Sequence, residues 1–168
     1  PKLLTIEREL IEDEQGNLFL IYHNNEFLTW SPVKKEFSAA HNFIPIPENW
    51  PIVDLKQQPG TRKYWIGRRE GLAVYNQETG KMSYWGHNTE KEPIIEKWGT
   101  IPVPNFFHFD RQGRFWMVSW LTGVFPQVIM YNEKSRGQKV RKFEILSKIQ
   151  TYHEISDIFE EKSGRIWI

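Results

Sequence analysis

The sequence contains no cysteine, which excludes disulfide bonds and thiol chemistry. Neither sign of charge is in excess, because 22 basic and 21 acidic residues leave a net charge of +1 over 168 residues. This balance gives no ground for binding to nucleic acid or to an anionic membrane surface. No apolar run is long enough to span a bilayer, and no signal peptide or lipidation motif is recognisable.

Motifs of catalysis are equally scarce. The chain has neither the Gly-x-Ser-x-Gly sequence of serine hydrolases nor a glycine-rich phosphate loop. His108 and Asp110 would lie on one side of a strand, but no third ligand at metal-binding spacing accompanies them. The acidic pairs Asp13-Glu14 and Glu160-Glu161 fall on turns, so no carboxylate pair is singled out for glycoside hydrolysis. We therefore expect no catalytic residue, no bound metal and no cofactor.

What the sequence does contain is one short motif that occurs four times. A turn with glycine is followed by an apolar run around an aromatic residue, at Phe19, Trp65, Trp116 and Trp167. These aromatic residues are separated by 46, 51 and 51 positions. A nearly fixed period in this range is typical of stacked units such as propeller blades or solenoid repeats.

The composition of each repeat indicates strands. Asp in the turn can bond to its own backbone and Gly accepts a positive φ, so turn and apolar run predict a β-hairpin. A third strand follows, most clearly at Gly71–Asn76, and a fourth is expected at Met82–Trp85. Four antiparallel strands per repeat make up a propeller blade. We predict an all-β fold in which residues 1–168 form a partial β-propeller, with blades at approximately 3–40, 52–85, 105–145 and, incompletely, 152–168.

The predicted propeller is incomplete. A closed ring of seven blades needs about 300 residues or more at this period, and the sequence holds about three and a half blades. The chain opens on Pro1 and stops at Ile168 within a predicted strand. We expect a fragment or processed piece whose open ends are covered by the remaining blades of a parent chain or by a second copy.

The second repeat carries a resemblance to a known family. Its Tyr-Trp-Ile-Gly, Gly-Leu-Ala-Val-Tyr-Asn and Thr-Gly segments, within Tyr64–Lys81, resemble the two-component regulator propeller repeat. Asp13–Leu20 and Asp110–Trp116 match it in part. The resemblance implies the periplasmic or otherwise extracytoplasmic sensor domain of a bacterial hybrid two-component system. The parent would be membrane-anchored and carry histidine kinase activity, whereas this segment would be non-catalytic. Many such sensors respond to oligosaccharides released from polysaccharides.

Ligands of propellers usually bind on the face formed by the crossings between blades and the loops between second and third strands. Tryptophan offers a flat surface for the C–H faces of sugars, and Asn, His and Arg offer hydrogen bonds to hydroxyl groups. If the ligand is acidic, arginines could bind its carboxylate or sulfate. The candidate residues on this face are His41, Asn42, Trp50, Arg68, Arg69, His87, Asn88, Trp98 and Trp120.

Plainer roles exist for the same residues. The off-repeat tryptophans would also serve in packing, and Arg68-Arg69 would also suit a solvated hairpin tip. Two other functions therefore stay open beside ligand sensing. One is a carbohydrate-active propeller enzyme, either a glycoside hydrolase or a lyase, and the other is a scaffold for protein interactions.

Overall fold

A computed structural model of the protein describes residues 9–22, 26–119, 126–134, 137–142, 155 and 157–168. Within these residues the regular structure is β-strand, apart from one short α-helix and one turn of 3-10 helix. Three four-stranded sheets follow one another along the chain, and a two-stranded hairpin comes last. The strands of each sheet are antiparallel and pair in sequence order.

We call the three sheets blades 1 to 3 and the last hairpin blade 4. Blade 1 consists of β1 (Glu9–Glu12), β2 (Leu18–Tyr22), β3 (Glu26–Ser31) and β4 (Glu36–Ser38), followed by the 3-10 turn η2 (Ala39–His41). Blade 2 consists of β5 (Ile52–Gln57), β6 (Lys63–Arg68), β7 (Gly71–Asn76) and β8 (Lys81–Tyr84). Helix α1 (Pro93–Trp98) leads to blade 3, with β9 (Pro104–Phe109), β10 (Arg114–Ser119), β11 (Gln127–Asn132) and β12 (Gly137–Lys142). Blade 4 is β13 (Phe159–Glu160) and β14 (Ile166–Trp167).

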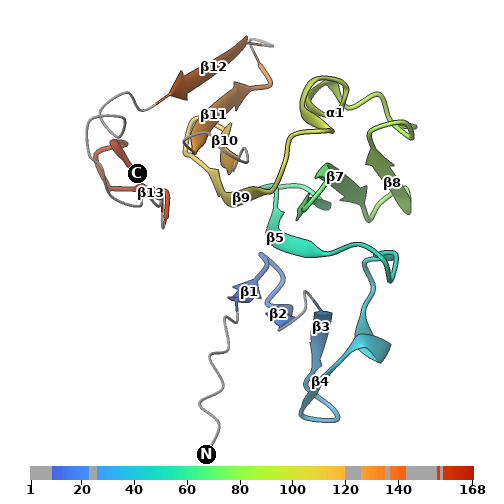
Figure 1. Ribbon diagram of the computed structural model, residues 1–168. Coiled ribbons are helices and arrows are strands. Elements are labelled where there is room, and N and C mark those ends of the chain that lie inside the picture. The colour runs from blue at the N-terminus through green and yellow to red at the C-terminus, as the bar shows by residue number, and fades with distance from the viewer. Residues whose placement is uncertain (1–8, 23–25, 120–125, 135–136, 143–154, 156) are drawn as a thin grey trace, which may run out of the picture.

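The blades are arranged like a fan. Strands β1, β5, β9 and β13, the first of each blade, lie towards its centre, whereas β4, β8 and β12 lie at its outside (Figure 1). This arrangement confirms the predicted fold class, an all-β chain made of partial propeller blades. The long crossing after blade 2 contains the short helix α1.

In blades 1 and 3 the first hairpin is held by the aspartate of its turn. The Oδ1 atom of Asp13 accepts the backbone N–H groups of Gln15 and Asn17 at 2.9 and 2.8 Å. Asp110 accepts the N–H groups of Gln112 and Arg114 in the same way, both at 2.9 Å. The glycine that completes each turn, Gly16 or Gly113, has a φ of 76° or 72°, where glycine carries no steric penalty.

The repeated tryptophan closes onto the same turn. The indole N–H of Trp116 donates to Asp110 at 2.7 Å, and that of Trp167 donates to Glu161 at 3.3 Å. In blade 2 the indole of Trp65 donates to Gln58 at 3.0 Å. Tryptophan in this motif therefore ties the second strand to the preceding turn, besides supplying apolar surface.

Blade 1 has phenylalanine in place of tryptophan and makes a different bond. Phe19 has no N–H to donate, and Asp13 instead accepts the hydroxyl of Tyr64, from blade 2, at 2.8 Å. The carboxylate that closes the first turn of blade 1 thus joins two blades directly.

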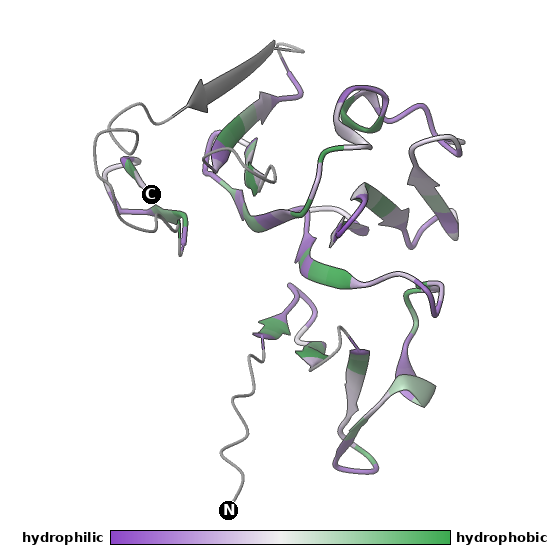
Figure 2. Cartoon of the chain, in the orientation of Figure 1, coloured by the Kyte–Doolittle hydropathy of each residue, from purple (hydrophilic) through white to green (hydrophobic). Residues whose placement is uncertain are grey.

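The apolar core lies between successive blades. Phe19 packs with Tyr64 and is fully buried, and Trp65 packs in turn against Phe115 of blade 3 at 5.3 Å between ring centroids. Figure 2 shows that strands such as β5 and β7 carry hydrophobic residues, as a core between blades requires. Trp167 has the same position in the repeat as Trp65 but is 53% exposed. The reason is that no further described blade packs onto blade 4.

A glycine of the motif marks where two blades approach most closely. A Cβ atom added to Gly67 would lie 2.0 Å from the carbonyl oxygen of Pro104, on the first strand of blade 3. The glycine of the Tyr-Trp-Ile-Gly sequence is therefore needed for packing, because any side chain there would separate blades 2 and 3.

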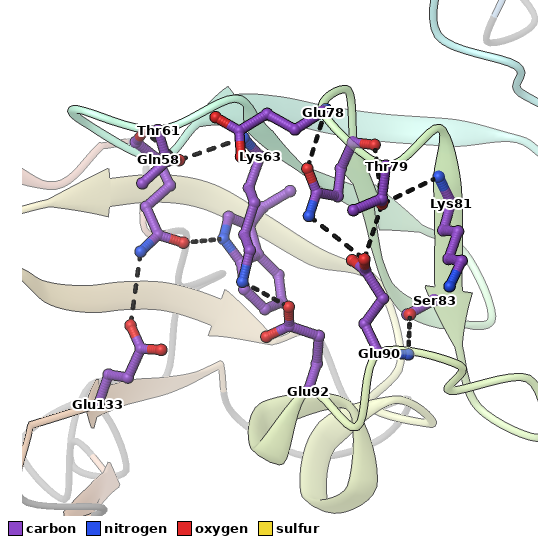
Figure 3. Close-up of polar contacts among 12 residues, drawn as sticks. Gln58, Thr61, Lys63, Glu78, Thr79, Lys81, Ser83, Glu90, Glu92 and Glu133 are labelled. Atoms are coloured by element: carbon purple, nitrogen blue, oxygen red, sulfur yellow. Dashed lines mark hydrogen bonds and ion pairs between the residues drawn. The ribbon is translucent and has the colours of Figure 1, made fainter.

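Polar side chains hold the long crossing that follows blade 2. Lys63 of β6 forms an ion pair with Glu92 at 2.6 Å, and Glu90 accepts the hydroxyl of Thr79 at 2.7 Å (Figure 3). Gln58, which binds the Trp65 indole, also reaches Glu133 of blade 3 at 3.4 Å. These contacts place the crossing against blade 2. At the other end of the blade, the N–H of Leu72 donates to the carbonyl of Gly99 and the N–H of Val103 donates to that of Arg69, both at 3.1 Å.

The hydrogen bond from Tyr64 to Asp13 predicts a specific loss of stability. We expect Tyr64→Phe to lower the free energy of unfolding by about 1–3 kcal/mol, since the carboxylate oxygen of Asp13 keeps the Nδ2 donor of Asn17 but loses the buried hydroxyl donor, while the ring remains. Urea denaturation measures the change. Tyr75→Phe is the matched control, because the Tyr75 hydroxyl makes no hydrogen bond to a described residue, and its effect should stay within about 0.5 kcal/mol. Equal losses in the two variants would contradict the role of this bond.

Candidate functional site

The strand register brings the predicted ligand face together at one edge of blades 1 and 2. Arg68, at the end of β6, is opposite both Ile52 of β5 and Gly71 of β7. Tyr84, at the end of β8, is opposite Ala73. The start of β3 and the crossing from 39 to 51 lie beside the groove described below. We call this rim the crossing edge.

Four side chains form a stack at the crossing edge. The guanidinium of Arg68 lies 3.8 Å from the ring centroid of Trp50, and Tyr84 meets Trp50 edge-on at 4.9 Å and 87°. The ring of His87 stacks on that of Tyr84, with 5.1 Å between the ring centroids and 30° between the ring planes. We refer to Trp50, Arg68, Tyr84 and His87 as the Trp50 stack. Three of its four members were among the predicted ligand residues.

Arg68 is held in this stack by the cation–π contact of its planar guanidinium with Trp50. A guanidinium over an indole is stabilised by the ring quadrupole, more strongly where water is excluded. The Arg68 side chain is 13% exposed, and burial lowers the pKa of its guanidinium from the ordinary value. Its nearest described carboxylate, that of Glu70, is 4.0 Å away, and its Nε has no hydrogen-bond partner among the described residues. Cation–π contact is therefore the main interaction of Arg68 that the structure shows.

A groove of about 470 Å³ opens beside the stack. Trp50 belongs to both, since its ring is stacked with Arg68 and also lines the groove. The lining contains one indole, two carboxylates and two amides, and its other residues are apolar. Its members are Glu26, Phe27, Leu28, Ala39, Asn42, Ile46, Pro47, Glu48, Asn49, Trp50, Pro51 and Ile52. Such a mixture can contact both the C–H faces and the hydroxyl groups of a small polar ligand.

Asn42 holds one wall of the groove in place. Its Nδ2 donates to the carbonyl of Phe27 at 2.8 Å, and its Oδ1 accepts the hydroxyl of Thr29 at 2.8 Å. Both partners are on β3, so this amide fastens the crossing to blade 1. Asn42 is thus a lining residue whose hydrogen bonds are largely used by the protein itself.

The other predicted residues are dispersed. The Nε2 atom of His41 lies 3.5 Å from a carboxylate oxygen of Glu36. Arg69 is an exposed residue of the β6–β7 turn, and Asn88 donates to Glu96 of the long crossing at 2.6 Å. Trp98 packs against the core between blades 2 and 3, and Trp120 lies outside the described residues.

Sequence reasoning missed four residues of this edge. Tyr84 was assigned only to a strand, although its position at the end of the fourth strand puts it on the same edge as the crossings. Glu26, Glu48 and Asn49 line the groove, and no repeat marks them, because crossings do not share the spacing of the blades. Charged and amide residues beside Trp50 in the sequence would have been the available signal for Glu48 and Asn49.

A second cavity, of about 240 Å³, lies among the first strands of the blades. Asp54 of β5, 4% exposed, accepts the backbone N–H of Phe107 from β9 at 2.7 Å. Burial and the negative charge of Glu9 together raise the pKa of Asp54 to about 7, although backbone hydrogen bonds oppose the rise. The other ionisable residues of the lining are Glu12, Lys56, His108 and Asp157.

The two residues considered for metal binding have other roles. Asp110 accepts hydrogen bonds from Trp116 and Arg114, which lower its pKa although burial opposes them. His108 lies 3.9 Å from Glu160, and burial lowers the pKa of its imidazole. Among the described residues, no group of three or more His, Asp or Glu side chains could hold a metal ion. In the same part of the chain, no helix has the length and apolarity that a membrane crossing requires.

Comparison with known proteins gives a structural likeness and no sequence match. Neither protein-family models nor curated proteins match the chain. The extracellular domain of BT3049 from B. thetaiotaomicron, described as a hybrid two-component system, superposes with a TM-score of 0.58 at 20% identity over 94% of this chain and 19% of its own. That of BT4673 from the same organism, described in one structure as a one-component and in another as a hybrid two-component system, gives TM-scores of 0.59 and 0.58 at 15% and 16% identity.

Each of the two BT4673 structures matches over 97% of this chain and 20% of its own length. At such identities the likeness establishes a shared fold. The chain therefore has the fold of part of these extracellular domains and spans about a fifth of their length. They are described as parts of signalling systems of the class that the repeat resembles.

The raised pKa of Asp54 predicts how stability depends on pH. Because the folded protein keeps a proton that the unfolded chain releases near pH 4, stability should fall as the pH rises from about 4 to about 7. Asp54→Asn cannot ionise and keeps an oxygen for Phe107. We expect this variant to gain about 1–4 kcal/mol over the wild type at pH 8.5 and to lose that advantage near pH 4.5.

Urea denaturation at the two pH values measures this difference. Asp157→Asn is the control, since it removes a carboxylate of the same cavity from an exposed residue. Its effect should be similar at the two pH values. An Asp54→Asn variant that is no more stable at pH 8.5 than at pH 4.5, relative to the wild type, would contradict the raised pKa.

Proposed function

We propose that this chain is a ligand-binding segment of the extracytoplasmic sensing domain of a hybrid two-component system, and that the crossing edge binds an oligosaccharide. The observation that carries the proposal is the Trp50 stack beside the groove. The repeat motif and the fold shared with extracellular domains of two-component systems support the cellular setting. The parent protein is then anchored in the membrane and passes the signal to a kinase module.

The chemistry of the groove suits a sugar. Pyranose rings present C–H groups that pack on an indole face, and Trp50 is held in a defined position by Arg68 and Tyr84. Hydroxyl groups both donate and accept hydrogen bonds, and the carboxylates and amides of the lining meet both needs. A rigid ring contact with polar groups around it gives orientation as well as affinity.

We propose that the site binds the oligosaccharide without cleaving it. Glycoside hydrolysis needs a carboxylic acid that stays protonated near neutral pH, which enzymes achieve by burying it. Glu26 and Glu48, the two carboxylates of the groove, are both exposed. A reducing-end assay with the glycans that bind separates the two functions, because release of product would favour the carbohydrate-active enzyme.

The same proposal assigns partners to the two open ends. The backbone N–H of Glu14 donates to Gln57 of the next blade at 2.8 Å, and that of Arg111 donates to Glu160 at 3.0 Å. Glu12 has the equivalent position in blade 1, is exposed, and makes no hydrogen bond to a described residue. At the other end Trp167 is 53% exposed. We propose that further blades of the same type, from the parent chain or a second copy, cover both ends.

Replacing Trp50 tests the binding site. We expect Trp50→Ala to weaken oligosaccharide binding about tenfold or more in isothermal titration against a panel of plant and microbial glycan fragments, because the ring contact is lost. Trp85→Ala is the matched control, since Trp85 is 55% exposed and absent from both the groove lining and the stack. Thermal melting of both variants separates loss of contact from loss of fold. Equal affinities for the wild type and a folded Trp50→Ala variant would refute the proposed site.

A further inference from the structure

The described charged residues that line the groove all have one sign. Glu26, the first residue of β3, and Glu48, in the crossing to blade 2, are exposed carboxylates that face the same space. Neither makes a hydrogen bond or ion pair with a described residue. Among the residues that the structure describes, no lysine, arginine or histidine belongs to the lining. The groove therefore presents acceptor oxygens and negative charge to whatever enters it.

The nearby cations are engaged elsewhere. Arg68 is stacked on Trp50, is 13% exposed and lies outside the lining, so its guanidinium is not offered to the groove. Arg69 also lies outside it. The ring of His41 lies 3.5 Å from Glu36, which would pair with it on protonation. Neither arginine therefore lines this groove.

Two carboxylates that line one groove discriminate between ligands by charge. A uronate or sulfate group placed near them is repelled, and the partly apolar wall formed by Phe27, Ile46 and Ile52 reduces the screening of this repulsion by water. Hydroxyl groups behave oppositely, because an O–H donor to a carboxylate makes a short, charge-assisted hydrogen bond. The same two residues thus favour binding of hydroxyl groups and disfavour binding of anionic groups.

We infer that the groove selects an oligosaccharide that carries no anionic group, and that Glu26 and Glu48 are the residues that set this specificity. The inference rests on the proposed function and narrows it to a class of ligand. Trp50 supplies the ring contact, and the two glutamates accept hydrogen bonds from sugar hydroxyls on either side of it.

The test compares glycans that differ only in charge. Isothermal titration of the purified protein uses neutral fragments of glucan, mannan, xylan, galactan and arabinan, together with oligogalacturonates, their methyl esters, and sulfated forms of the neutral fragments. We expect the tightest ligand to be non-anionic. Its sulfated or carboxylated counterpart should bind at least about tenfold more weakly at low ionic strength.

The double variant Glu26→Gln/Glu48→Gln keeps the shape of the groove and removes both charges. It should bring the affinities of the charged and uncharged forms to within about threefold of each other. Glu78→Gln/Glu133→Gln is the control, because it changes the net charge equally at two exposed residues outside the lining, and it should leave the discrimination intact.

Several outcomes would overturn the inference. An anionic glycan that binds as tightly as its neutral form would overturn the specificity alone and leave sugar binding in place. So would a Glu26→Gln/Glu48→Gln variant that discriminates as strongly as the wild type. Absence of binding to every glycan of the panel would overturn the proposed function as well, and with it this narrower claim.

Discussion

The sheets of this chain carry apolar side chains on both faces, as blade 2 shows, and these must be buried against neighbouring blades and the crossings that connect them. That constraint governs the rest of the structure. Phe19 and Tyr64 meet between blades 1 and 2, and Trp65 and Phe115 meet between blades 2 and 3. Because stacked blades must approach closely, Gly67 can carry no side chain opposite Pro104. Hydrogen bonds between turns then set how one blade is placed on the next, as between Glu14 and Gln57.

The position of the candidate site follows from the same architecture. Inside a blade, backbone groups are paired and side chains alternate between two apolar interfaces, so little polar chemistry is available there. The crossings between blades are not part of the hydrogen-bond ladders of the sheets. They run across one edge, where their side chains are free to vary. Trp50 and Glu48 come from such a crossing, whereas Arg68 and Tyr84 come from strand ends that reach the edge.

Periodic features could be predicted from the sequence, and features of the crossings could not. The period of the aromatic motif predicts the strands, the turns and the fold class, and the same period places Trp50, Arg68 and His87 on one edge. It fails for Trp167, whose exposure depends on a neighbour and not on the motif. It also gives no means to separate Trp98, which packs in the core, from Trp50, which lines the groove, because neither belongs to the repeat.

Carboxylates in three surroundings show how burial and hydrogen bonding divide structural from ligand-binding roles. Asp110 receives several N–H donors and stays charged as part of a turn. Asp54 is buried with few donors, and its pKa of about 7 makes it a source of pH dependence. Glu26 and Glu48 are exposed and bound to no described residue, so their acceptor capacity is free for a ligand. Since neither belongs to the inter-blade core, their substitution changes the chemistry of the groove without changing what holds the blades together.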